Sequence, residues 1–206
     1  EMAKKASFRG YGPERGYDFL REAIIKNDFL PRGIHLDMNE IFVNDGAKSD
    51  TGNFQEILRW DNNIGVTDPV YPVYIDSNVM IGRAGVFENG QWSNVTYIPC
   101  TADNNFIPKI PDHRVDMIYL CYPNNPTGTF VNKKIFSEVL EFCKNYKTKF
   151  LIDEAFIDFM KNGGKKSYKN FGDKRIIIIR AFTKFYGIPG LRLGYSIVCD
   201  KILKKN

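Results

Sequence analysis

Short apolar runs alternate with amphipathic segments along most of this 206-residue chain. Runs rich in branched apolar residues and bounded by turn residues are typical of buried strands, and seven are expected here. They cover residues 41–44, 64–67, 95–98, 116–120, 149–152, 175–179 and 194–198. Apolar residues at helical spacing predict helices over residues 17–27, 73–80 and 133–145. A further helix is expected to begin at Asp50 or Thr51 and to run to about Arg59.

The alternation of strands and helices predicts an α/β fold. Such chains form three layers, in which helices cover both faces of a mostly parallel sheet, here of seven strands. The Gly/Asn-rich patch over residues 82–93 predicts a loop or a hairpin tip around Asn89–Gly90. The sequence contains no internal repeat, so the chain is expected to form one α/β domain.

Side chains capable of polar contacts follow several of the predicted strands. Ligands bind at the carboxyl ends of the strands in sheets of this kind, so these residues are expected to meet in one cavity. Lys184 alone reads more simply as a surface lysine after a core strand, and the shared position of the set favours a functional role. The residues after the first, second, fourth, fifth and sixth strands are Lys48, Tyr71, Asn125, Asp153 and Lys184.

Composition and charge narrow the function classes. A hydrophobic content of 43% with 26% charged residues is ordinary for a water-soluble globular protein. The net charge of +5 comes without a basic helix, so nucleic acid is not an expected partner. No apolar run approaches the roughly 20 residues of a membrane span, and the N-terminal residues lack the apolar core of a signal peptide.

The four cysteines predict neither disulfides nor a metal centre. They are isolated, no CxxC motif occurs, and both histidines lie far from any cysteine in the sequence. Reduced thiols in a cytoplasmic protein are therefore expected, with no structural metal.

Five motifs together resemble one enzyme family. They are DGAK, DPVYPVY, YPNNPTG, DEAF and FTKFYGIPGLRLGY, in this order along the chain. The set is similar to that of the fold-type I aminotransferases, which use pyridoxal 5'-phosphate. The resemblance implies the large, cofactor-binding domain of that family over residues 1–206, without the family's N-terminal arm and C-terminal small domain.

The two parts of the chain resemble different branches of this family. Residues 8–150 look most like the LL-diaminopimelate aminotransferases, through FRGYGPERGYDFLRE, EIFVNDGAKSDTGN and DPVYPVYIDSNVM. Residues 153–198 look more like the histidinol-phosphate aminotransferase and threonine-phosphate decarboxylase branch. Phe156 stands where the diaminopimelate enzymes usually have tyrosine, and Ala181 where serine is common.

The resemblance implies a role for each residue near the cofactor ring. Lys184 would form the internal aldimine and then shuttle a proton, which requires a pocket that removes water from its amine. Asp153 would pair with the pyridinium nitrogen and Asn125 would donate to the ring oxygen, beside Phe156. Tyr71 would stack on the ring. Without the resemblance, Asp153 reads equally well as a helix cap and Asn125 as a turn residue.

The resemblance also implies a cup for the cofactor phosphate. The resemblance places Ala47 and Lys48 at a helix start, where backbone N–H groups bind anions. Thr183 and Arg192 would complete the cup, whereas Ala181 offers no hydroxyl. Tyr11 resembles a residue that the partner subunit lends to the phosphate, so a homodimer is expected.

The leading interpretation is amino transfer between LL-diaminopimelate and 2-oxoglutarate, in lysine biosynthesis. Histidinol-phosphate amino transfer, decarboxylation of an amino-acid phosphate, and a cofactor-binding fragment without turnover are the alternatives. The family's substrate-carboxylate arginine belongs to the small domain, so little transamination is expected of this stretch alone.

Two X–Pro bonds lie in turns that are expected to form the site. Proline is the usual residue after a cis peptide, and tight turns retain it. At least one of Asp68–Pro69 and Asn125–Pro126 is therefore expected to be cis.

Overall fold

The computed structural model describes residues 10–161, 167–171 and 173–199, and a seven-stranded sheet is its centre. The N-terminal residues on which the signal-peptide expectation rests lie outside this range. The strand order is β1-β9-β8-β7-β6-β2-β5, and a separate pair, β3 with β4, forms a short hairpin. The strands are β1 (Ile41–Asn44), β2 (Ile64–Asp68), β3 (Phe87–Glu88), β4 (Gln91–Trp92), β5 (Val95–Pro99), β6 (Met117–Cys121), β7 (Lys149–Asp153), β8 (Ile176–Ala181) and β9 (Gly194–Val198).

The sheet is mostly parallel, as the sequence predicted. Strands β5, β2, β6, β7 and β8 pair in parallel, and within the seven-stranded sheet β9 runs against its neighbours β8 and β1. The register aligns Cys121 with Asp153, and Asp153 with Ile179. The carboxyl ends of β6, β7 and β8 therefore lie at one edge of the sheet, where the loops that follow them meet.

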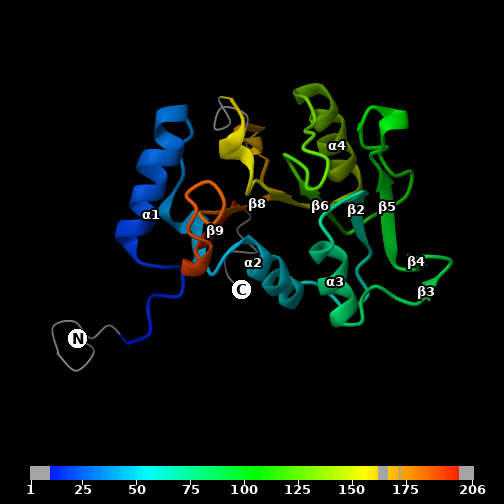
Figure 1. The fold of residues 1–206 in the computed structure, drawn as a ribbon, viewed down its shortest axis with the longest axis horizontal. Helices are drawn as coiled ribbons and strands as arrows, with labels where there is room; N and C mark the ends of the chain where they lie inside the picture. The colour runs from blue at the N-terminus through cyan, green and yellow to red at the C-terminus, as the bar shows by residue number, and fades with distance from the viewer. Residues whose placement is uncertain (1–9, 162–166, 172, 200–206) are drawn as a thin grey trace.

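Helices cover both faces of the sheet (Figure 1), with α1 and α4 on one side and α2 and α3 on the other. The side chains of β7 show the alternation: Phe150 and Ile152 pack with α1 and α4, and Leu151 packs with α2 and α3. The helices are α1 (Asp18–Ile24), α2 (Ala47–Asn53), α3 (Val73–Met80) and α4 (Lys133–Tyr146). A π-helical turn, η1 (Ile25–Phe29), continues α1.

Short 3-10 segments fill most connections. They are η2 (Leu30–Arg32), η3 (Met38–Glu40), η4 (Phe54–Ile57), η5 (Ala102–Asn104), η6 (Ile157–Phe159), η8 (Tyr168–Phe171) and η9 (Pro189–Leu191). No helix among the described residues combines the length and the apolar character that a membrane crossing needs.

Helix α4 forms for reasons that are visible in the sequence. The Asn132 side chain caps its first turn by accepting the N–H of Ile135 at 3.0 Å. Phe136, Val139 and Cys143 recur at helical spacing and are buried. This apolar stripe packs in the same core cluster as Phe150 and Ile152 of β7, so α4 covers the face of the sheet on which these two side chains lie.

The expected start of the second helix was wrong. Helix α2 begins at Ala47, and Asp50 lies inside it rather than at its cap. Gly46 has a φ of 115°, a value that suits glycine, so the chain turns from β1 into the helix three residues earlier than predicted. The helical segment then ends in η4 at Ile57.

Candidate active site

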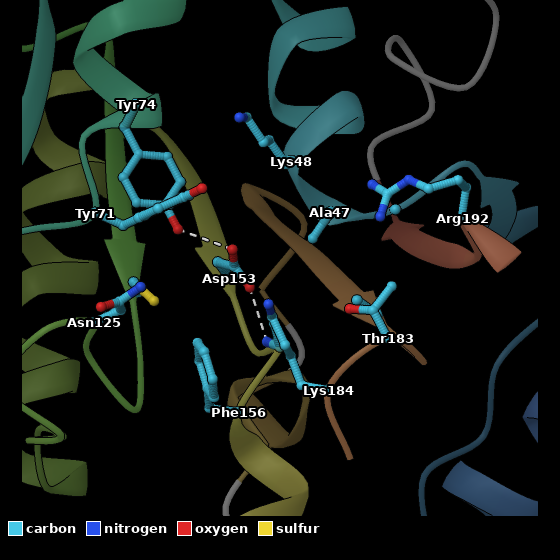
Figure 2. Close-up of a pocket in the computed structure, with 14 residues that line it drawn as sticks. Ala47, Lys48, Tyr71, Tyr74, Asn125, Asp153, Phe156, Thr183, Lys184 and Arg192 are labelled. Atoms are coloured by element: carbon cyan, nitrogen blue, oxygen red, sulfur yellow. Dashed lines mark hydrogen bonds between the residues drawn. The ribbon is translucent and has the colours of Figure 1, made fainter. Parts of the chain in front are cut away.

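A cavity of about 190 Å³ lies at the carboxyl ends of β6, β7 and β8. Ten of the eleven residues proposed from the sequence line it, and Figure 2 shows several of their side chains pointing into one space. The predicted convergence is confirmed, although these residues come from stretches far apart in the chain. They are Ala47, Lys48, Tyr71, Asn125, Asp153, Phe156, Ala181, Thr183, Lys184 and Arg192.

Tyr11, the eleventh, lies elsewhere. Its side chain is fully exposed in the segment before α1, and it does not line the cavity. The resemblance assigned Tyr11 to the partner subunit's site, so Tyr11 is not expected to line the cavity of its own chain.

One end of the cavity is built for an anion. The first turn of α2 directs backbone N–H groups toward it, and the buried Thr183 hydroxyl lines the same end. The guanidinium of Arg192 approaches Gly46 so closely that a β-carbon there would lie 3.1 Å from Nη2. Arg192 itself has a φ of 49° and donates from Nη1 to the carbonyl of Pro189 at 3.1 Å. This set of donors fits a phosphate group.

Asp153 supplies a buried carboxyl at the centre of the cavity. It ends β7, and its two oxygens each accept one hydrogen bond. The backbone N–H of Ala155 donates to Oδ1 at 2.8 Å, and the hydroxyl of Tyr74 donates to Oδ2 at 2.9 Å. Burial raises the pKa of Asp153 to about 6, and these two donors oppose the rise by stabilising the charged form.

Lys184 reaches the cavity from the turn after β8, but it is less enclosed than expected. The resemblance implied a pocket that removes water from its amine. In the described chain Lys184 is exposed, and the neighbouring Phe185 and Tyr186 are 47% and 53% exposed. Thr183, which precedes Lys184, is buried instead, so the exposed part of the turn begins at Lys184.

Two proline turns hold Tyr71 and Asn125 at the other side of the cavity. Both Asp68–Pro69 and Asn125–Pro126 are cis, as predicted for at least one of them, and Tyr122–Pro123 is also cis. The buried Asn124 amide donates to the Pro69 carbonyl at 3.1 Å, so it ties one turn to the other. This tie fixes the spacing between the two loops that deliver Tyr71 and Asn125.

A buried ion pair lies directly behind the site. Arg180 on β8 contacts the carboxylate of Glu154 at 3.3 Å and that of Asp158 at 3.3 Å. Burial raises the pKa of Glu154, and the positive charge of Arg180 opposes that rise. The Tyr195 hydroxyl accepts from Arg180 at 3.1 Å and donates to Asp28, which links β8 and β9 to η1.

Four lining residues were not singled out from the sequence. They are Gly46, Tyr74, Cys121 and Ala155. Cys121 carries no sequence signal of a site, whereas Ala155 lies within the DEAF motif, two residues after Asp153. Tyr74 follows Tyr71 by three residues at the start of a predicted helix, and that spacing could have placed both rings on one side.

The family assignment comes from whole-chain comparisons. Residues 1–205 match the family described as Aminotransferase class I and II. The chain is 57% identical over 203 residues to the LL-diaminopimelate aminotransferase of Bacteroides thetaiotaomicron. It is 45% identical over 210 residues to that of Methanosphaera stadtmanae. These matches cover 96% and 100% of the chain but 50% and 51% of the relatives, so the chain spans about half their length.

Solved structures show the same fold. LL-diaminopimelate aminotransferase from Chlamydomonas reinhardtii superposes with a TM-score of 0.85 at 30% identity, over 97% of this chain and 50% of that one. Aspartate aminotransferase from Thermotoga maritima gives a TM-score of 0.77 at 23% identity, over 98% of this chain and 54% of that one, a likeness of fold alone. The sequence match and the shared architecture agree, and the chain belongs to the aminotransferase class I and II family.

Proposed function

We propose that this chain is the cofactor-binding part of an LL-diaminopimelate aminotransferase, which moves an amino group between LL-diaminopimelate and 2-oxoglutarate. The observation that carries the proposal is the meeting of Lys184, Asp153 and Arg192 in one cavity. The similarity to relatives that bear this name supports the choice of substrate. Residues 1–206 would correspond to the large domain of such an enzyme.

The cofactor proposed for the cavity is pyridoxal 5'-phosphate. Its phosphate would lie against the N–H groups at Ala47 and Lys48, with Thr183 and Arg192. Ala181 lines the same cavity but has no hydroxyl to add. When bound, this cofactor supplies a carbonyl that bonds to amines and a ring that accepts electrons.

Side chains around the rest of the cavity would hold the ring. The carboxylate of Asp153 would face the ring nitrogen and keep that nitrogen protonated. Asn125 would donate to the ring oxygen, a contact in which Phe156 cannot share because it has no hydroxyl. Tyr71, which is half-buried, would lie against one face of the ring.

Lys184 is the proposed catalytic residue. Its Nζ would anchor the cofactor and, once free, would take the proton from the substrate's α-carbon and return it at the cofactor. The exposed side chain of Lys48 also lines this cavity, and its positive charge would attract an anionic substrate. We also propose that the working form is a homodimer, in which Tyr11 reaches the phosphate of the partner's site.

Cofactor attachment is the first test. Protein mixed with pyridoxal 5'-phosphate is expected to gain a visible absorption band, and borohydride should then fix the label permanently. Peptide mapping should find that label on Lys184. Lys184→Ala should lose the band, whereas Lys134→Ala, an exposed lysine on α4, should keep it. A label spread over surface lysines in the unaltered chain would refute the proposal.

The substrate is tested separately, on the cofactor-loaded chain. LL-diaminopimelate should change the visible spectrum, and 2-oxoglutarate should restore it with formation of glutamate. Histidinol phosphate and amino-acid phosphates are the competing substrates, and carbon dioxide release marks decarboxylation. A spectral response to histidinol phosphate but not to LL-diaminopimelate would refute the proposed substrate and favour the histidinol-phosphate aminotransferase branch. The spectral change is the primary readout, because little turnover is expected of this stretch alone.

A further inference from the structure

The hydroxyl of Tyr74 lies directly against the carboxyl group of Asp153. Tyr74 occupies the first turn of α3, is completely buried, and donates to Oδ2 at 2.9 Å (Figure 2). The Ala155 N–H donates to the other oxygen at 2.8 Å. With one fixed donor on each oxygen, the carboxyl group cannot rotate without losing a buried hydrogen bond.

The Tyr74 ring is itself held from two sides. It stacks on Tyr119, with ring centroids 5.6 Å apart and planes at 23°. It meets Tyr71 edge-on, with centroids 6.2 Å apart and planes at 82°. The Tyr119 hydroxyl accepts from the amide of Gln55 at 2.8 Å, so the second ring is also anchored. The Tyr74 hydroxyl is therefore delivered to Asp153 by a packed aromatic pair.

We propose that Tyr74 is a positioning residue of the site: its hydroxyl fixes the orientation and the ionised state of the Asp153 carboxylate that faces the cofactor ring. The inference rests on the proposed function, because it assigns Asp153 to the ring nitrogen. Tyr74 acts through Asp153 and has no assigned contact with the reacting atoms.

Burial makes such a donor necessary. An enclosed carboxyl group favours its neutral form, and the pKa of Asp153 is about 6 even with both hydrogen bonds in place. Burial also raises the pKa of Tyr74 well above its usual value, so the phenol stays protonated and remains a donor at every pH of interest. The hydrogen bond stabilises the charged carboxylate more than the neutral acid, so its removal would raise the pKa of Asp153 further.

Other charged groups near Asp153 have different effects on its ionisation. Glu154, the residue directly after β7, opposes ionisation of Asp153, but Arg180 pairs with the Glu154 carboxylate. Tyr74 is the only side chain among the described residues that hydrogen-bonds Asp153 directly. The titratable groups that line the same cavity are Lys48 on α2, Tyr71 before α3, Tyr74 on α3, Cys121 on β6, and Lys184 and Arg192 after β8.

The test compares Tyr74→Phe with Tyr119→Phe. The first removes only the oxygen that touches Asp153, and the second removes a buried hydroxyl from the stacked neighbour. The dissociation constant of pyridoxal 5'-phosphate is measured by visible absorption from about pH 5 to about pH 9. A hydrogen bond to a charged group corresponds to a factor of about ten or more. Tyr74→Phe should therefore weaken binding at neutral pH about tenfold, and the acidic limb of the profile should move up by about one pH unit.

Tyr119→Phe should leave the position of that limb unchanged. Equal displacement in both variants would assign the effect to packing and overturn the proposal, as would a Tyr74→Phe profile that matches the unaltered protein. In an Asp153→Asn background, Tyr74→Phe should no longer shift the pH profile. Urea unfolding of each cofactor-free variant shows whether the fold is retained.

A second readout does not depend on the cofactor. Infrared difference spectra against Asp153→Asn isolate the titration of the Asp153 carboxyl group in cofactor-free protein. Its midpoint should rise by about one pH unit in Tyr74→Phe. An unchanged midpoint would refute the role of Tyr74 even if the cofactor binds. A raised midpoint in a protein that never binds the cofactor would instead refute the proposed function.

Discussion

Asp153 is expected to destabilise the cofactor-free protein at neutral pH, and Asp153→Asn should relieve this. The pKa of the carboxyl group rises from 3.8 to about 6 on folding, because burial disfavours its charge. At about 1.36 kcal/mol for each pKa unit, ionised Asp153 costs about 3 kcal/mol of folding free energy. Asparagine has nearly the same shape, and its Oδ1 can still accept from the Ala155 N–H.

The destabilisation by Asp153 depends on pH. Well below the ordinary pKa, both folded and unfolded chains hold the proton, and the carboxyl group has no such cost. As the pH rises from 3.8 toward 6, the unfolded chain loses its proton first, so this contribution to stability falls. Above that window the loss is complete and constant. Asp153→Asn removes the titrating group and so removes the decline.

The assay is urea unfolding followed by circular dichroism, at about pH 4 and about pH 7. The variant should exceed the unaltered protein by about 2–3 kcal/mol in free energy of unfolding at neutral pH, and by less than about 1 kcal/mol at the acidic pH. Asp103→Asn, at an exposed aspartate in η5, is the matched control and should change neither value. A neutral-pH gain no larger than the acidic one would refute the reasoning. The same variant should bind pyridoxal 5'-phosphate more weakly, because the negative charge at the ring nitrogen is lost.

Three further variants test how the sheet supports the site. Gly194→Ala should lower the free energy of unfolding by about 1–3 kcal/mol in urea titrations, because a β-carbon there would lie 2.7 Å from the Arg180 carbonyl oxygen; an unchanged midpoint would contradict this. Arg180→Met should cost about 3–5 kcal/mol by leaving Glu154 buried without its cation, and adding Glu154→Gln should restore part of the loss, which a double-mutant cycle measures. Asn132→Ala should cost about 1 kcal/mol by removing the cap of α4, seen as a lower Tm, and an equal Tm would show that the cap is dispensable.

The order of the strands and helices, and the reactive side chains that follow them, can be predicted from the sequence. Branched apolar runs are buried strands because they pack on both faces, and the predicted seven-stranded, mostly parallel sheet is present. Strand polarity then places the residues after β6, β7 and β8 at one edge. For that reason the sequence alone predicts that Asn125, Asp153 and Lys184 meet in one cavity, which the structure contains.

Contacts between side chains that are distant in the sequence depend on how the elements pack. Tyr74 and Asp153 are 79 residues apart, and their hydrogen bond exists only because α3 packs across the same face of the sheet onto which the Asp153 side chain projects. The start of α2 depended on the positive φ of Gly46 beside Arg192, which no periodicity reveals. Lys184 is exposed although the adjacent Thr183 is buried, a difference that no sequence pattern marks. Side-chain periodicity specifies faces and strand polarity specifies edges, whereas contacts between distant segments depend on how the crossover connections pack in three dimensions.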